Sequence, residues 1–359
     1  MTHRIWSRSD DPVFRIAIAF VAVAALVGVR ATLPQAQPQP RAAFAAEIAS
    51  LSEPGGYFDT DNLISNERSY LDVLPELDKR TVHGGVYIGV GPDQNFSYIA
   101  RLKPSIAFIL DIRRDNLLLH LLFKALFEQA RTRIEYLALL FGRPVPDDLN
   151  SWRSAPIARL AEYIDRSNSE PKSIDELRIR LDRVVKGFGV PLTEEDFATI
   201  NRFHRRFITS GLELQFQSLG RSPQSYYPTY RELLLATDGS GQQGNYLASE
   251  DGFQFIKSMQ TRDRIIPVTG NLSGPSALVG IGRTMSTKGE TLSAFYASNV
   301  EFYLERQGTY LRFVNNLGRV PHTNHSVIIR SVFNRGMGGG STSEIQPVEE
   351  LLSQSASRR

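Results

Sequence analysis

The sequence contains no cysteine, which excludes disulfides, thiolate metal sites and cysteine nucleophiles. It also lacks the Gly-x-Ser-x-Gly motif of serine hydrolases. Its six histidines are scattered, with no His-x-x-x-His pair and no Asp-rich cluster, so we expect no bound metal. Neither sign of charge dominates, because 41 Lys and Arg face 38 Asp and Glu. No basic stripe is present, and nothing indicates a nucleic acid partner.

Long hydrophobic runs are scarce, and the one that stands out lies near the N-terminus. Ile16 to Val29 is apolar and follows Arg4, Arg8 and Arg15. At about 14 residues it is short for a membrane span and typical of a signal-peptide core. We predict that residues 1–45 are a signal peptide or membrane anchor with a Pro/Ala-rich linker. The domain would then be exported or membrane-anchored outside the cytoplasm, touching the membrane only through this segment. The alternative is a terminus that packs on the domain.

The rest of the chain has the composition of a globular protein, with 42% hydrophobic and 22% charged residues. Short apolar runs alternate with helical patterns, which predicts an α/β fold. We expect a Rossmann-like parallel sheet with helices on both faces over residues 46–335. Residues from about 145 to 222 carry helical patterns only, which predicts a helical insertion between the second and third strands. From Gly336 onward, the glycines and serines predict a disordered tail.

One stretch has the order of parts found in a nucleotide-binding βαβ unit. A strand pattern ends in Gly89-Val90-Gly91, a helical pattern follows, and the run Ile106 to Leu110 ends in Asp111. Gly89 and Gly91 would let a ligand touch the backbone. Asp93 or Asn95 could cap the helix. The alternative is a tight strand-to-helix turn without a ligand.

The segments Gly85 to Arg113, Asp61 to Pro75 and Thr291 to Leu304 resemble an uncharacterised bacterial family similar to class I S-adenosylmethionine-dependent methyltransferases. The resemblance implies S-adenosylmethionine as a small-molecule cofactor, with an unknown methyl acceptor. It implies these cofactor-binding residues: Gly89, Gly91, Asp93, Asp111 and Asn271. Asp111 would hold the ribose hydroxyls.

Two positions depart from the family pattern. Tyr87 stands where an acid is usual, and Asp93 stands where a third glycine is usual. A dinucleotide fingerprint fits worse, because it requires glycine at Gln94. The alternative function is an exported, non-enzymatic binding or structural protein that keeps the fold without the cofactor. The signal-like N-terminus favours that alternative.

The loop after the fourth predicted strand, Leu292 to Tyr296, would border the reacting methyl group in such a fold. We predict Asn299 and Glu301 as its catalytic residues. Asn299 would hydrogen-bond an acceptor, and Glu301 would accept a proton or cap the next helix. The alternative is that Asn299 simply caps a helix from Val300 to Arg306.

One long, largely buried helix is predicted from Asp115 to Phe141, because this stretch is apolar and has no proline or glycine. His120 lies on it, with no partner acid or second histidine at ligand spacing. We interpret it as an ordinary helix residue.

Overall fold

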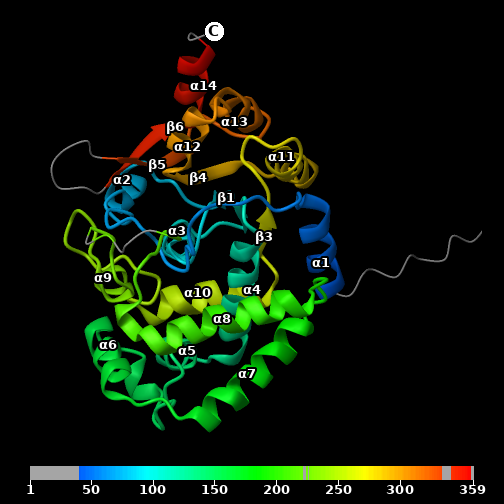
Figure 1. Cartoon of the computed structure of the whole chain (residues 1–359). Helices are drawn as coiled ribbons and strands as arrows, with labels where there is room; N and C mark the ends of the chain where they lie inside the picture. The colour runs from blue at the N-terminus through cyan, green and yellow to red at the C-terminus, as the bar shows by residue number, and fades with distance from the viewer. Residues whose placement is uncertain (1–39, 221–223, 225, 334–340, 357–359) are drawn as a thin grey trace, which may run out of the picture. The chain divides into compact units, whose positions relative to one another are not determined.

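The structure is a computed structural model that describes residues 40–220, 224, 226–333 and 341–356 (Figure 1). Its centre is a six-stranded sheet with the strand order β3-β2-β1-β4-β5-β6. Neighbouring strands from β3 to β5 pair in parallel, and β6 pairs antiparallel with β5. The strands are β1 Val86–Gly89, β2 Ile106–Asp111, β3 Ile265–Thr269, β4 Leu292–Ser298, β5 Val327–Phe333 and β6 Ser341–Pro347. This is a mixed α/β fold, compatible with a Rossmann-like one.

The helices connect and cover these strands. They are α1 Pro40–Leu51, α2 Leu74–Lys79, α3 Gln94–Leu102, α4 Arg114–Gln129, α5 Arg133–Leu140, α6 Ile157–Arg166, α7 Pro171–Lys186, α8 Glu194–Ser210, α9 Tyr230–Leu235, α10 Glu250–Thr261, α11 Ala277–Lys288, α12 Val300–Arg306, α13 Tyr310–Leu317 and α14 Val348–Ala356. Short 3-10 turns form at Asn150–Trp152 and Gly211–Glu213.

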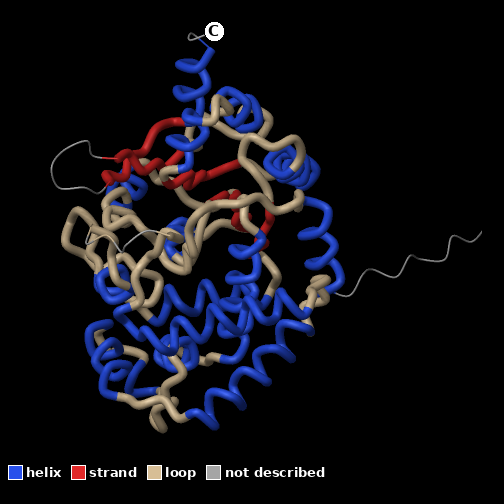
Figure 2. Tube along the Cα trace, viewed as in Figure 1, coloured by secondary structure: helices blue, strands red, loops and turns tan. Residues whose placement is uncertain are grey.

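Helices lie on both faces of the sheet (Figures 1 and 2). On one face α4 packs against β2 and β3, and α10 packs on α3 and α4. On the other face α11 contacts β2 and packs with α1 and α13. Because both faces are covered, β1, β3 and β4 are buried along their whole length. Their continuous apolar sequences are typical of such a sheet.

The single long helix predicted from Asp115 to Phe141 is wrong, because the chain breaks between α4 and α5. Ala130 is extended, and Thr132 caps α5 by accepting a bond from the backbone N–H of Glu135. The Glu135 carboxylate in turn accepts from the N–H of Arg131 at 2.7 Å. Thr-x-x-Glu is a capping-box pattern, and it starts a new helix without proline or glycine.

Both predicted ends of the domain also need correction. Residues 40–45 belong to α1, whose Phe44, Ile48 and Leu51 are buried, so the fold begins before residue 46. The tail predicted as disordered from Gly336 contains β6 and α14. The β6 sequence is polar because it forms the sheet edge, and its partner β5 supplies the pairing.

The apolar run Ile16 to Val29 lies outside the described residues. Within the described ranges, no helix combines the length and the apolar character that a membrane span requires. The helical patterns expected between about residues 145 and 222 are present as α6, α7 and α8. A capping box of Thr193 and Asp196 starts α8.

Candidate functional site

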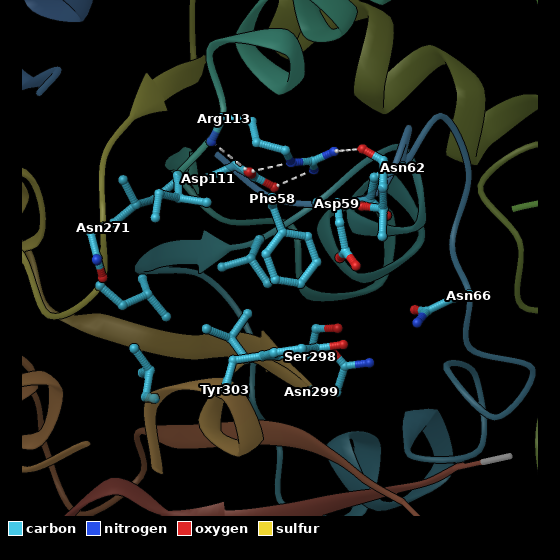
Figure 3. A pocket seen from close by; sticks show the side chains of 18 of the residues that line it. Phe58, Asp59, Asn62, Asn66, Asp111, Arg113, Asn271, Ser298, Asn299 and Tyr303 are labelled. Atoms are coloured by element: carbon cyan, nitrogen blue, oxygen red, sulfur yellow. Dashed lines mark hydrogen bonds and ion pairs between the residues drawn. The ribbon is translucent and has the colours of Figure 1, made fainter. Parts of the chain in front are cut away.

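A pocket opens where β1, β2, β3 and β4 end, with about 1050 Å³ of atom-free space that is partly open to solvent (Figure 3). The sheet order reverses between β1 and β4, and open α/β sheets bind ligands at such a switch point. Strand ends and their loops supply these lining residues: Val90, Gly91, Gln94, Leu110–Arg113, Gly270–Leu272 and Ser298–Val300. The segments 58–66 and 303–307, together with Phe216, Ser218 and Tyr227, supply the remaining walls.

The pocket contains some of the predicted site residues and not others. Gly91, Asp111, Asn271 and Asn299 line it. Gly89, Asp93 and Glu301 are not among the lining residues, and each has a different structural role, described below.

Asp111 stands at the end of β2, as predicted, but its carboxylate is paired with Arg113. Arg113 donates from its backbone N–H and its Nε to Oδ1, at 2.9 and 3.1 Å, and from Nη2 to Oδ2 at 2.9 Å. Both side chains are nearly buried, at 8% and 10% exposure. Three of about four acceptor positions on the carboxylate are therefore used. Sequence motifs did not identify Arg113.

Arg113 also fixes the wall above the strand ends. Its Nη1 donates to the backbone carbonyls of Thr60 and Asp61 at 3.3 and 3.4 Å (Figure 3). The neighbouring N–H of Gly56 donates to the carbonyl of Ile112 at 2.8 Å. Segment 58–62 is thus held over the ends of β2, where it forms part of the pocket.

The side chain of Asn95 holds the glycine turn and fills the space beside Gly89. Its Nδ2 donates to the carbonyls of Val90, Gly91 and Pro92 at 2.9, 3.2 and 2.8 Å. A Cβ at Gly89 would lie 1.9 Å from the Oδ1 of Asn95. Gly89 is therefore required by Asn95, and the predicted ligand contact at Gly89 stays a prediction. Gly91 does line the pocket and has a φ of +83°, which favours glycine.

Two further side chains support this turn from inside the core. The Tyr87 hydroxyl, at the position where the family pattern has an acid, donates to the Oδ1 of Asn95 at 2.8 Å. His120 Nε2 lies 2.9 Å from the carbonyl oxygen of Gly91. Burial lowers the pKa of His120 to about 4, so the ring is neutral at pH 7. His120 is a buried helix residue that steadies the turn.

Asp93 neither caps α3 nor faces the pocket. Its side chain makes no cap bond, and it is 5% exposed. Its Oδ2 accepts from the hydroxyls of Tyr230 at 3.0 Å and Tyr246 at 3.2 Å. Burial raises the pKa of Asp93 to about 6. The acid at the third-glycine position therefore belongs to a buried tyrosine cluster, and its predicted cofactor contact stays a prediction.

The end of β4 presents Asn299 to the pocket. Ser298 has a φ of +53°, in the left-handed region that residues other than glycine rarely adopt. Asn299 occupies the N-cap position of α12 but makes no side-chain cap bond, so the capping alternative is wrong. Its Nδ2 is buried and has no partner among the described residues.

Glu301 points away from the pocket, toward β5. Its Oε2 lies 3.5 Å from the Nε of Arg330, and burial raises the pKa of its carboxyl. Glu301 is therefore not among the residues of the pocket wall, and its role beside a methyl acceptor stays a prediction.

Aromatic side chains complete the walls, and no motif indicated them. Phe58 and Tyr303 meet edge-to-face with ring centroids 4.8 Å apart. Phe216 and Tyr227 pack at 4.6 Å. These rings come from segments far apart in the sequence, so only the folded chain brings them together. Such walls suit a planar organic group.

No group of three or more His, Asp or Glu side chains in the described part of the chain could hold a metal ion. Polar groups from Gln94, Asn271 and Asn299, together with the aromatic walls, can instead bind an organic molecule.

Comparison with known proteins gives a family match of unknown function. A family model described as "Domain of unknown function (DUF7790)" matches residues 63–144 and 194–353. The match covers the ends of β1 to β4 and omits residues 145–193. No curated protein matches the sequence.

Proposed function

We propose that this chain, which belongs to the DUF7790 family, is an S-adenosylmethionine-dependent methyltransferase-like protein with its cofactor site in the pocket at the ends of β1 to β4. One observation carries the proposal: the pocket lies at the switch point of a mostly parallel sheet. Of the five residues that the resemblance places against the cofactor, Gly91, Asp111 and Asn271 line it.

The lining residues fit a nucleoside-type group. The one acceptor position of Asp111 that Arg113 leaves unused can take a ribose hydroxyl. Ile112 and Leu272 offer apolar contacts for a base, and Asn271 also lines the pocket. S-adenosylmethionine would supply an electrophilic methyl group on a sulfonium centre. The chain's own residues would orient the partners and exclude water, which is most of what methyl transfer requires.

The second candidate is a binding protein without methyl transfer. The observation that favours it is the Asp111–Arg113 pair, since it neutralises the carboxylate that would bind the ribose. The displacement of Gly89 and Asp93 from the pocket supports the same alternative.

Calorimetric titration of the full chain with S-adenosylmethionine and S-adenosylhomocysteine separates these candidates. The methyltransferase proposal expects saturable binding that Asp111→Asn weakens at least tenfold, because a charge-assisted bond contributes about 1.5–3 kcal/mol. Asp115→Asn, an exposed acid at the start of α4, is the matched control and should bind like wild type. Absence of saturable binding to wild type would reject the cofactor and leave the binding-protein candidate.

We also propose that residues from about 145 to 222 are a helical insertion in a Rossmann-like fold. The family match omits residues 145–193 of this range, which contain α6 and α7. Export of the domain stays a proposal that rests on the arginine-flanked apolar run Ile16 to Val29. An alkaline phosphatase fusion after residue 60 should be active; an inactive fusion beside an active cytoplasmic reporter would contradict export.

A further inference from the structure

We propose that the side of the pocket between β1 and β4 is a subsite for an uncharged amide-type group, a carbonyl oxygen beside an N–H as in a carboxamide or lactam. Gln94 would accept from the N–H, and Asn299 would donate to the carbonyl oxygen. The inference rests on the proposed function only in assigning this group to the methyl acceptor.

Gln94 supplies the acceptor. It is the first residue of α3, lines the pocket and is 6% exposed. Its Nε2 donates to the hydroxyl oxygen of Tyr296 at 3.4 Å, and its Oε1 is buried with no partner in the described ranges. An acceptor left in this state costs stability unless a ligand pairs with it.

The orientation of the Gln94 amide is set by a buried carboxylate. Glu67 is 1% exposed and accepts the hydrogen of the Tyr296 hydroxyl at 2.8 Å. Tyr296 therefore meets Gln94 with its oxygen lone pairs, which only the NH₂ side of the amide can satisfy. The Gln94 carbonyl oxygen is left free for a ligand, and Glu67 acts as a positioning residue.

Asn299 supplies the donor, and Glu67 fixes it as well. The hydroxyl of Ser298 donates to Glu67, which holds the left-handed turn that precedes Asn299. Asn299 is 8% exposed, and its Nδ2 has no partner within the described part of the chain. Both residues line the pocket, so one buried network leaves an unused acceptor and an unused donor in the same pocket wall.

The charge distribution favours a neutral group. The charged residues among the described pocket lining are Asp59, Asp111 and Arg113. Arg113 is paired with Asp111, and the two lie on the opposite side of the pocket from Ser298 and Asn299 (Figure 3). A carboxylate ligand at the subsite would meet the Gln94 oxygen without a cation. An amide satisfies both unused atoms and adds no charge.

Benzamide and benzoate test the subsite, because they share a ring and differ only in carrying an amide or a carboxylate. Ligand-detected NMR titration of the full chain should show benzamide binding at least tenfold tighter than benzoate. Asn299→Asp replaces the donor with an acceptor-only carboxylate and should weaken benzamide binding at least fivefold. Asn168→Asp makes the same chemical change at an exposed position outside the pocket and should have no effect.

Tyr296→Phe tests the positioning argument with little change in volume. Without the hydroxyl, the Gln94 amide can turn its NH₂ toward the pocket, so the preference for benzamide over benzoate should shrink. Equal binding of both probes, no binding of benzamide, or an unchanged benzamide affinity in Asn299→Asp would overturn the subsite. Benzamide preference without S-adenosylmethionine binding would support the subsite and reject the cofactor. S-adenosylmethionine binding without benzamide preference would support the cofactor and reject the subsite.

Discussion

Asn95 satisfies three backbone carbonyls of the glycine turn with one amide nitrogen. Its oxygen is held by Tyr87, and together these two side chains fill the space beside Gly89. The packing of these two side chains requires a glycine at this position, just as a bound phosphate or amino acid would. The turn is therefore rigid before any ligand arrives.

Gly89→Ala should destabilise the protein by about 3 kcal/mol, at the upper end for overpacking a core site, because the new Cβ would overlap the Asn95 amide. Chemical denaturation of Gly89→Ala, Asn95→Ala and the double variant measures the coupling. The cost of Gly89→Ala should fall by at least about 1 kcal/mol in the Asn95→Ala background, since the overlapping atom is gone. If the losses of stability of the two single variants simply add in the double variant, Asn95 is not the reason that position 89 requires glycine.

Asp93 makes stability depend on pH. Its pKa is about 6 in the folded protein and near 3.8 when exposed, so the folded state binds the extra proton between these values. The contribution of Asp93 is fully present below pH 3.8 and is lost as the pH rises through 6. Two pKa units correspond to about 3 kcal/mol.

The comparison of wild type with Asp93→Asn isolates this contribution from that of His120, whose lowered pKa acts in the opposite direction over an overlapping range. The free energy of unfolding of the variant should rise relative to that of wild type as the pH rises from 4.5 to 7. Urea denaturation at each pH measures both values. A constant difference across this range would exclude titration of Asp93.

At the scale of elements, β6 protects the edge of the sheet. It pairs along all seven residues of β5, from Val327 opposite Pro347 to Phe333 opposite Ser341. The helix that follows buries Val348 and Leu351. Without this segment, β5 would present an unpaired apolar edge.

A chain that stops after residue 340 should therefore lose roughly 3 kcal/mol or more, because it lacks the apolar burial that Val348 and Leu351 supply, and should aggregate on heating. A chain that stops after residue 356 keeps β6 and α14 and is the control. Thermal unfolding with light scattering compares the two. Equal melting temperatures would show that β6 and α14 contribute nothing to the fold.

For the whole molecule, local patterns predicted β1, β2 and β4, because each is an apolar run bounded by turns. The break between α4 and α5 was missed although Thr132 and Glu135 carry its signature. The edge strand β6 could not be recognised, since it is polar and its pairing depends on β5.

The pocket was predictable only in part. Gly91 and Asp111 follow from the order of strand, glycine turn and acid. The pairing of Asp111 with Arg113, the burial of Asp93 under Tyr230 and the wall formed by Phe58 are long-range contacts. No local spacing encodes such contacts, because they depend on how distant segments pack.

Among amides that exchange by local opening, ligand binding should slow those in the segments that meet in the pocket. The walls come from residues 58–66, the glycine turn, the ends of β2 and β3, and residues 298–307. Bound ligand fixes these groups, so their backbone amides should exchange more slowly with solvent. Residues 145–193 contribute nothing to the lining and serve as the internal control.

Hydrogen exchange of the full chain with and without saturating S-adenosylmethionine tests this expectation by mass spectrometry. Binding at 100 times the Kd stabilises the folded state by about 2.7 kcal/mol, and sites that open globally gain that protection everywhere. The informative amides are therefore the fast ones that open locally in the loops. Slower exchange confined to 58–66 and 298–307 would place the ligand in this pocket. Protection confined to 145–193 would place it elsewhere and contradict the proposed site.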